Sequence, residues 1–129
     1  MSLASAVGAL TRTKMLAAVS AANTAAATSA YIDVRGYEGQ VAVEISQGII
    51  TGTVDYTFST NDAANGSGAT LIVPLGGALA QITTSNDDAI YTAIFDAKQL
   101  RGYLAVIGTV GTGPAVVAYT FIGRKKYAA

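Results

Sequence analysis

Runs in which apolar and polar side chains alternate dominate the chain after residue 30. Val41, Val43 and Ile45 alternate with small or polar neighbours, and the run from Ala89 to Phe95 places Ile90, Thr92 and Ile94 opposite Tyr91, Ala93 and Phe95. A period of two puts successive side chains on opposite faces of an extended strand, so these runs predict β-strands. Strands that alternate with long helices are not indicated, which argues against a doubly wound α/β fold.

Segments rich in turn-forming residues separate the runs, as in the stretch NDAANGSGAT over 61–70. The loop Gly111–Pro114 has the composition of a hairpin loop. Seven or eight short strands separated by such turn segments predict an all-β fold, an antiparallel β-sandwich or jelly roll. The strands are expected near 41–46, 54–59, 71–73, 81–84, 89–95, 100–110 and 115–122.

The first thirty residues have a different composition from the rest. They are rich in Ala, contain the basic residues Arg12 and Lys14, and have no acidic residue. We therefore predict an N-terminal arm over residues 1–30 and a β-sandwich domain over residues 31–129. The arm either lies on a neighbouring subunit or packs as a helix or strand on its own domain, and the spacing of Leu3, Val7, Leu10 and Lys14 would suit a short helix.

The residues that are missing limit the chemistry. The 129 residues include no Cys and no His, which excludes thiolate chemistry, the Ser-His-Asp triad and most zinc sites. The carboxylates near Asn86, Asp87 and Asp88 lack calcium-binding spacing and suit a turn. The net charge is zero, which does not favour nucleic-acid binding, and no apolar run approaches the ~20 residues that span a membrane. We expect no enzymatic activity, no metal and no cofactor.

The surface composition instead favours assembly. Only 12% of residues are charged, against about 25% in a typical soluble domain, while 51% are hydrophobic. The charges are also segregated, because all eight acidic residues lie between Asp33 and Asp96 while both ends of the chain are basic. This distribution suits head-to-tail contacts between copies, or docking of the ends on an acidic partner; a solvated tail is the alternative.

Several segments occur in an order that resembles one family. An Ala-rich arm leads into AYIDVRGYEG over 30–39, later come IFD over 94–96 and LRGYLAV over 100–106, and the chain ends in GRKKY over 123–127. This order is similar to that of the capsid decoration, or cement, proteins of tailed bacteriophages. The resemblance implies a jelly-roll domain on the outer surface of the virion capsid, made in the bacterial host cytoplasm. Its partners would be the major capsid protein and, in a homotrimer, itself.

We predict that the contacts with the capsid come from the arm and the tail of the chain. The candidate interface residues are Arg12, Lys14, Met15, Leu16, Arg124, Lys125, Lys126 and Tyr127. An ordinary surface or core-edge role remains open for them. Other readings are another virion component, such as a tail-tube or head-tail joining protein, and a glycan-binding module, which would need exposed aromatic side chains on one face.

Overall fold

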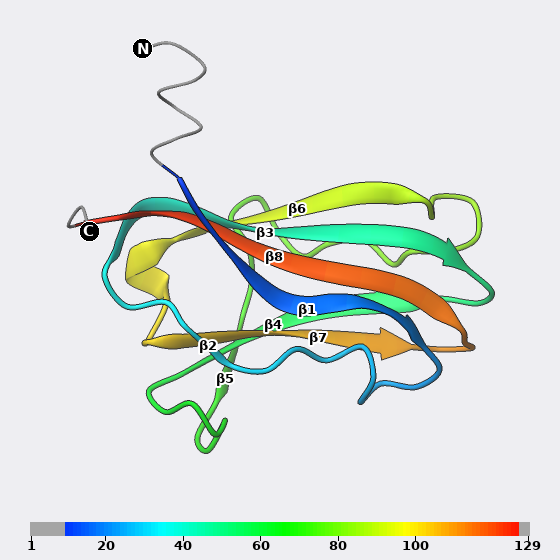
Figure 1. Cartoon of the computed structure of the whole chain (residues 1–129), viewed down its shortest axis with the longest axis horizontal. Helices are drawn as coiled ribbons and strands as arrows, with labels where there is room; N and C mark the ends of the chain where they lie inside the picture. The colour runs from blue at the N-terminus through cyan, green and yellow to red at the C-terminus, as the bar shows by residue number, and fades with distance from the viewer. Residues whose placement is uncertain (1–9, 127–129) are drawn as a thin grey trace, which may run out of the picture.

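Two four-stranded antiparallel sheets pack face to face in the computed structural model, which describes residues 10–126 (Figure 1). Sheet A has the order β1-β8-β3-β6 and sheet B the order β2-β7-β4-β5. The elements are β1 (Thr11–Ala21), β2 (Ile32–Asp33), β3 (Tyr37–Ile50), β4 (Val54–Asn61), β5 (Thr70–Ile72), β6 (Ala89–Asp96), the short 3₁₀-helix η1 (Ala97–Gln99), β7 (Tyr103–Val110) and β8 (Ala115–Lys125).

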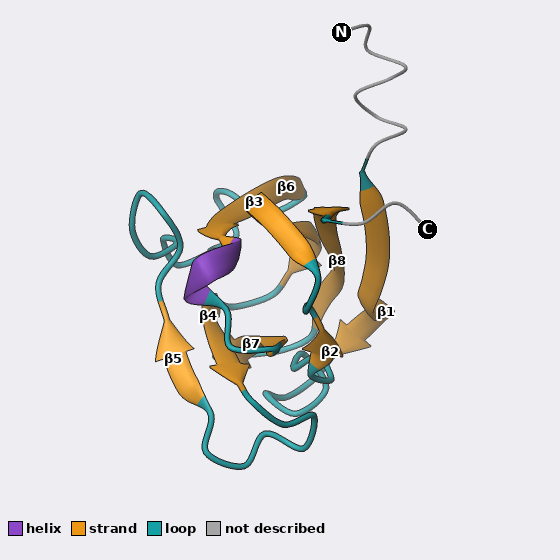
Figure 2. Ribbon diagram, turned by 90° about the vertical axis from the view of Figure 1, so that its left-hand side faces the viewer, coloured by secondary structure: helices purple, strands orange, loops and turns teal. Residues whose placement is uncertain are grey.

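The strand order is that of a jelly roll. The first strand pairs with the last, β2 with β7, β3 with β6 and β4 with β5, all antiparallel. Such pairing arises when a long antiparallel ribbon wraps around itself, and it gives the two-sheet architecture of eight-stranded jelly rolls. Figure 2 shows the result, with β5 and β6 along one side of the sandwich and β1 and β2 along the other. The predicted all-β sandwich is confirmed.

Part of the segment predicted as an arm is a strand of the sandwich. Residues Thr11–Ala21 pair with β8 from Thr11↔Gly123 to Ala21↔Ala115, with two irregularities between Lys14 and Val19. Of the alternatives for this segment, the structure shows a strand on its own domain and no helix from Thr11 to Ala21. The rest of the proposed helix, including Leu3 and Val7, lies outside the described residues.

The core forms where the inner faces of the two sheets meet. Phe58 of β4 and Phe95 of β6 cross edge to face with ring centroids 5.1 Å apart, and so join sheet B to sheet A. Tyr56 and Tyr119 make a second such pair at 5.8 Å. Aromatic pairs of this geometry add about 0.5–1.5 kcal/mol beyond the area they bury. Val117, Tyr119 and Phe121 of β8 also pack into this core.

Two local predictions differ from the structure. The loop Gly111–Pro114 closes no hairpin, because β7 belongs to sheet B and β8 to sheet A, so the chain crosses between the sheets there. The strand expected over 81–84 is reduced to one bridge, Val54↔Ile82. In both places the sequence shows a turn or an extended run but contains nothing that identifies the pairing partner.

A buried tyrosine fixes the connection between β1 and β2 to the core. The Tyr119 hydroxyl donates a hydrogen bond to the carbonyl oxygen of Ala27 at 2.5 Å. Gly108 of β7 leaves the necessary space, since a Cβ there would lie 2.6 Å from the Tyr119 oxygen. Burial raises the pKa of Tyr119, and also that of Tyr56, well above the usual value. Residues before Tyr31 thus contribute to the fold of the domain.

Candidate docking surfaces

Several charged groups of residues 10–126 have structural partners within the domain. No group of three or more His, Cys, Asp or Glu in this part of the chain could hold a metal ion. Several carboxylates have structural partners: Asp33 binds Arg35 at 2.7 Å, and this hydrogen bond lowers the pKa of Asp33 to about 2. Asp62 pairs with Arg101, which lowers the pKa of Asp62, and Asp96 caps η1.

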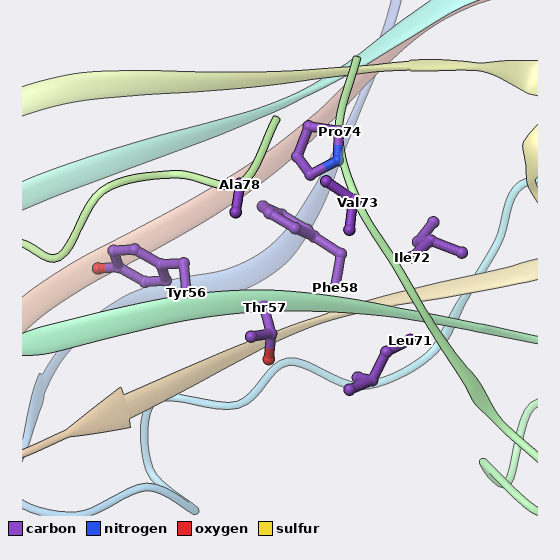
Figure 3. A pocket seen from close by; sticks show the side chains of 8 residues that line it. All are labelled: Tyr56, Thr57, Phe58, Leu71, Ile72, Val73, Pro74 and Ala78. Atoms are coloured by element: carbon purple, nitrogen blue, oxygen red, sulfur yellow. The ribbon is translucent and has the colours of Figure 1, made fainter. Parts of the chain in front are cut away.

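One apolar pocket lies beside β5, and Figure 3 shows its lining. Its volume is about 110 Å³, and the side chains of Phe58, Leu71 and Val73 are among those that form it. Leu71 and Val73 are themselves exposed, at 65% and 56%. The pocket has room for one aliphatic side chain, and no charged group lines it.

The outer face of sheet A is open to solvent, and the part formed by β8, β3 and β6 carries few charges. Away from Asp96 and the Glu38–Arg124 pair, these strands present small and aliphatic side chains outward, and Glu44 is the one charged residue there. Antiparallel sheets usually place polar residues on a solvated face. We call this surface the open face; its outward residues are Ala42, Glu44, Ser46, Ile90, Thr92, Ile94, Val116, Ala118, Thr120 and Ile122.

The largest apolar side chains of the open face are well exposed. Ile90 is 64% accessible, Val116 42% and Ile94 39%. Beside them a hollow of about 230 Å³ is lined in part by Leu10 and Ile122. Large exposed apolar surfaces bounded by polar residues are typical of protein interaction sites.

The outer face of sheet B is partly covered by the chain itself. The Tyr31 hydroxyl hydrogen-bonds the Ser59 hydroxyl at 2.8 Å, and the Tyr31 ring lies against the loop at Gly66. As a result Ser59 and Ala105, which point outward from sheet B, are 2% and 1% exposed. The two sheets therefore differ, because the outer side of sheet B is partly covered by the chain while the outer side of sheet A is not.

The candidate interface residues of β1 have different environments. Arg12 and Lys14 are exposed, and their pairing with Ile122 and Thr120 places them on the same side of sheet A as the open face. Met15 is 6% exposed and packs in the core, so it offers almost no surface to a partner. Leu16 is half-buried against the same core.

The structure brings the basic residues from both ends of the chain together. Because β1 and β8 are antiparallel, Arg12 lies beside the end of β8, where Arg124, Lys125 and Lys126 are exposed. Arg124 also approaches Glu38 of β3 at 3.8 Å. The last candidate, Tyr127, lies outside the described residues.

The basic residues of the rest of the chain lie at the same end of the sandwich, which we call the basic end. Arg35 precedes β3, while Lys98 and Arg101 lie in or just after η1, between the end of β6 and the start of β7. In Figure 1 this is the end where β3 begins and β8 finishes. Seven of the eight basic residues are located there; Lys14 lies nearer the middle, level with Glu44 through Thr120.

At the opposite end of the sandwich, the charged side chains that the structure describes are all acidic, and we call it the acidic end. Asp55 is the second residue of β4, and Asp87 and Asp88 precede β6. The Asp87 carboxylate accepts a hydrogen bond from the Ile50 backbone at 2.9 Å, and Asp55 accepts one from Gln81 at 2.9 Å. Neither of these two carboxylates has a cation partner within the described residues.

The open face was not predicted as an interface, although its sequence contained a sign of it. The run from Ala89 to Phe95 has apolar residues on both of its faces, with Ile90 and Ile94 on one and Phe95 on the other. A strand with only one buried face would show polar residues at Ile90 and Ile94. Apolar residues on both faces are therefore the feature of the sequence that could have pointed to this exposed surface.

Aromatic side chains are scarce on the described surface. Tyr31, Tyr91 and Tyr103 are half-buried, and the other aromatic residues between 10 and 126 are buried. Such a surface does not favour the glycan-binding module, which stacks sugars on exposed rings. Between residues 10 and 126 there is no helix of the length and apolarity needed to cross a membrane.

Comparisons with known proteins give no family. No family model matches the chain, and a search of curated proteins finds no similar sequence. Among solved structures, similar chains include one from the disulfide-linked pili of Bacillus endospore appendages, at 14% identity and a TM-score of 0.44, with 90% of this chain and 88% of that chain covered.

Two further solved structures show a similar degree of likeness. One is the Tobacco streak virus coat protein, at 11% identity and a TM-score of 0.38, with 94% of this chain and 89% of that chain covered. The other is the Eiger TNF of S. frugiperda, at 12% identity and a TM-score of 0.42, with coverage of 93% and 95%. At these identities and TM-scores the matches carry no information about function.

Proposed function

We propose that this chain is a non-catalytic structural protein of the virion that decorates a tailed-phage capsid and bridges neighbouring capsomers. Its partners are the major capsid protein and further copies of itself in a homotrimer. It is made in the host cytoplasm and acts on the capsid surface. The observation that carries the proposal is the open face, an uncovered and nearly uncharged surface on a domain of only 129 residues.

The size of the open face fits such a contact. Three strands spaced ~4.8 Å apart and roughly 35 Å long present roughly 500 Å². A stable interface buries about 800 Å² on each partner, so one copy binds weakly to moderately. Many copies on one lattice act together, and a ligand that binds only the assembled state stabilises that state. A capsid surface repeats the same binding site many times, so it would allow many copies to bind together.

Co-sedimentation with capsid shells tests the proposal. Shells are made from the major capsid protein of the same phage genome, and the purified protein is added to them. Wild-type protein is expected to sediment with the shells and to raise the temperature at which they dissociate. Ile90→Lys and Val116→Lys each place a charge on the open face and are expected to reduce binding at least tenfold.

The matched control is Thr57→Lys, which adds the same charge at an exposed position on the outer side of sheet B. It should bind shells as the wild type does, and circular dichroism should show that all three variants are folded. The proposal fails if wild-type protein does not bind assembled shells, or if Ile90→Lys binds as tightly as Thr57→Lys.

A second candidate is another virion component, such as a tail-tube or head-tail joining protein. The separation of the basic end from the acidic end favours it, because unlike ends suit repeated head-to-tail contacts. Purified protein that forms large rings or growing tubes, and that does not bind shells, would support this candidate over capsid decoration.

A further inference from the structure

The zero net charge of this protein conceals a separation of charge along the strand direction. The basic end contains seven cationic side chains and four carboxylates, those of Asp33, Glu38, Asp62 and Asp96, so its net charge is three positive charges. Among residues 10–126, the acidic end has the three carboxylates of Asp55, Asp87 and Asp88 and no cation. Lys14 and Glu44 lie in one row across the middle of sheet A and balance each other.

The excess cations are available for a partner. Within residues 10–126 the ion pairs of the basic end are Arg35–Asp33, Arg101–Asp62 and Arg124–Glu38. The side chains left without an acidic partner there are exposed, namely those of Arg12, Lys98, Lys125 and Lys126.

The two ends are far enough apart to act separately. Strand β8 has 11 residues, which corresponds to roughly 35 Å. The Debye length at physiological salt is about 8 Å, so the two ends do not neutralise each other within one copy. Each end therefore presents its own potential to solvent.

We propose that the basic end of one copy docks on the acidic end of a second copy. The two ends have excess charges of equal size and opposite sign. A second copy of the chain is therefore a partner with a surface of complementary charge. The contact uses different surfaces on the two copies, so it repeats until it closes into a ring or continues as a chain. It rests on the proposed self-assembly of the chain, and a closed ring of three would be the proposed homotrimer.

Nucleic acid is a less suitable partner for the basic end. A phosphate backbone calls for a continuous basic stripe, whereas three of the arginines here are already paired with carboxylates. Three excess charges provide only weak, salt-sensitive binding to DNA. This end contains both cations and carboxylates, so an acidic protein surface that also carries hydrogen-bonding groups is a better match for it.

Two variants with reversed charge test the contact. Lys98→Glu/Lys125→Glu/Lys126→Glu makes both ends acidic, and Asp55→Lys/Asp88→Lys makes both ends basic; neither touches the core or the Asp87 hydrogen bond. The mass in solution is measured by light scattering across protein concentrations. Wild type is expected to associate in low salt, at about 0.05 M, and at least tenfold more weakly at about 0.5 M.

Each variant alone is expected to remain a single chain, and an equal mixture of the two should associate again because unlike ends then meet. This recovery excludes misfolding as the cause of the loss, and Thr57→Glu serves as the control for a charge placed away from both ends. A mass that stops at three chains, or one that continues to rise, supports the contact as a closed ring or an open chain.

The proposal is overturned if wild type is monomeric in low salt, if its association does not depend on salt, or if the mixture fails to associate. Retention of the monomeric protein on DNA through Lys125 and Lys126 would assign the basic end to nucleic acid instead. Co-sedimentation of Ile90→Lys with shells tests a different surface, so loss of capsid docking and loss of the end-to-end contact can be distinguished.

Discussion

The substitution Met15→Ala tests whether the first strand belongs to the domain or is only a docking arm. Met15 is 6% exposed and packs into the core from an edge strand, within an irregular part of its pairing with β8. Removal of a buried Met side chain costs about 2–5 kcal/mol, and an edge strand can relax, so we expect about 2–3 kcal/mol. For a domain of this size that lowers the melting temperature by roughly 6–12 °C.

Denaturant and thermal unfolding, followed by circular dichroism, measure this effect at one protein concentration. The neighbouring control Lys14→Ala removes an exposed side chain and should change the free energy of unfolding by less than ~0.5 kcal/mol. Met15→Leu conserves volume and should cost less than about 1.5 kcal/mol. If Met15→Ala and Lys14→Ala are equally stable, β1 does not contribute to the core, and residues 1–30 act as a separate arm after all.

Two further predictions concern the buried tyrosines. Gly108→Ala would place a Cβ 2.6 Å from the Tyr119 oxygen and 2.9 Å from the Ala27 carbonyl, and thermal unfolding should show a loss of about 1–3 kcal/mol; unchanged stability would mean that this contact is absent. Burial raises the pKa of Tyr56 and Tyr119, so above pH 10 these tyrosines ionise in the unfolded chain while they stay neutral in the folded one. Their contribution to the free energy of unfolding is complete below pH 10. Above pH 10 it should fall by up to about 1.4 kcal/mol per pH unit for each tyrosine. Unfolding curves between pH 9 and 11 should therefore show a steeper decline for wild type than for Tyr119→Phe, and equal slopes would contradict the assignment.

The strands of the central region could be predicted because local patterning decides them. The run Ala89–Phe95 alternates without interruption, and the structure places Ala93 and Phe95 in the core and Ile90 on the surface, as a period of two requires. Strand β8 shows the same alternation, with buried residues at every second position from Ala115 to Gly123. For such strands the burial pattern follows from the order of the side chains.

Strand β1 could not be predicted, because its sequence lacks that alternation. Thr11–Ala21 mixes small residues with two cations, and its burial is irregular, since the pairing with β8 shifts register twice. Ala has low β propensity, so the segment does not specify an extended state by itself. The free edge of β8 specifies it, and that is a long-range pairing that a single sequence does not show.

The strand topology determines where the charged residues of the sequence lie on the folded molecule. Along the chain, basic residues occupy both ends and acidic residues the middle, which resembles a symmetric molecule. The jelly roll pairs the first strand with the last, so both basic segments meet at one end of the sandwich, and Lys98 and Arg101 join them because η1 links β6 to β7 at that end. The turn before β6 carries Asp87 and Asp88 to the other end. A sequence with basic residues at both termini thus folds into a molecule with one basic and one acidic end. Head-to-tail assembly requires two such complementary ends.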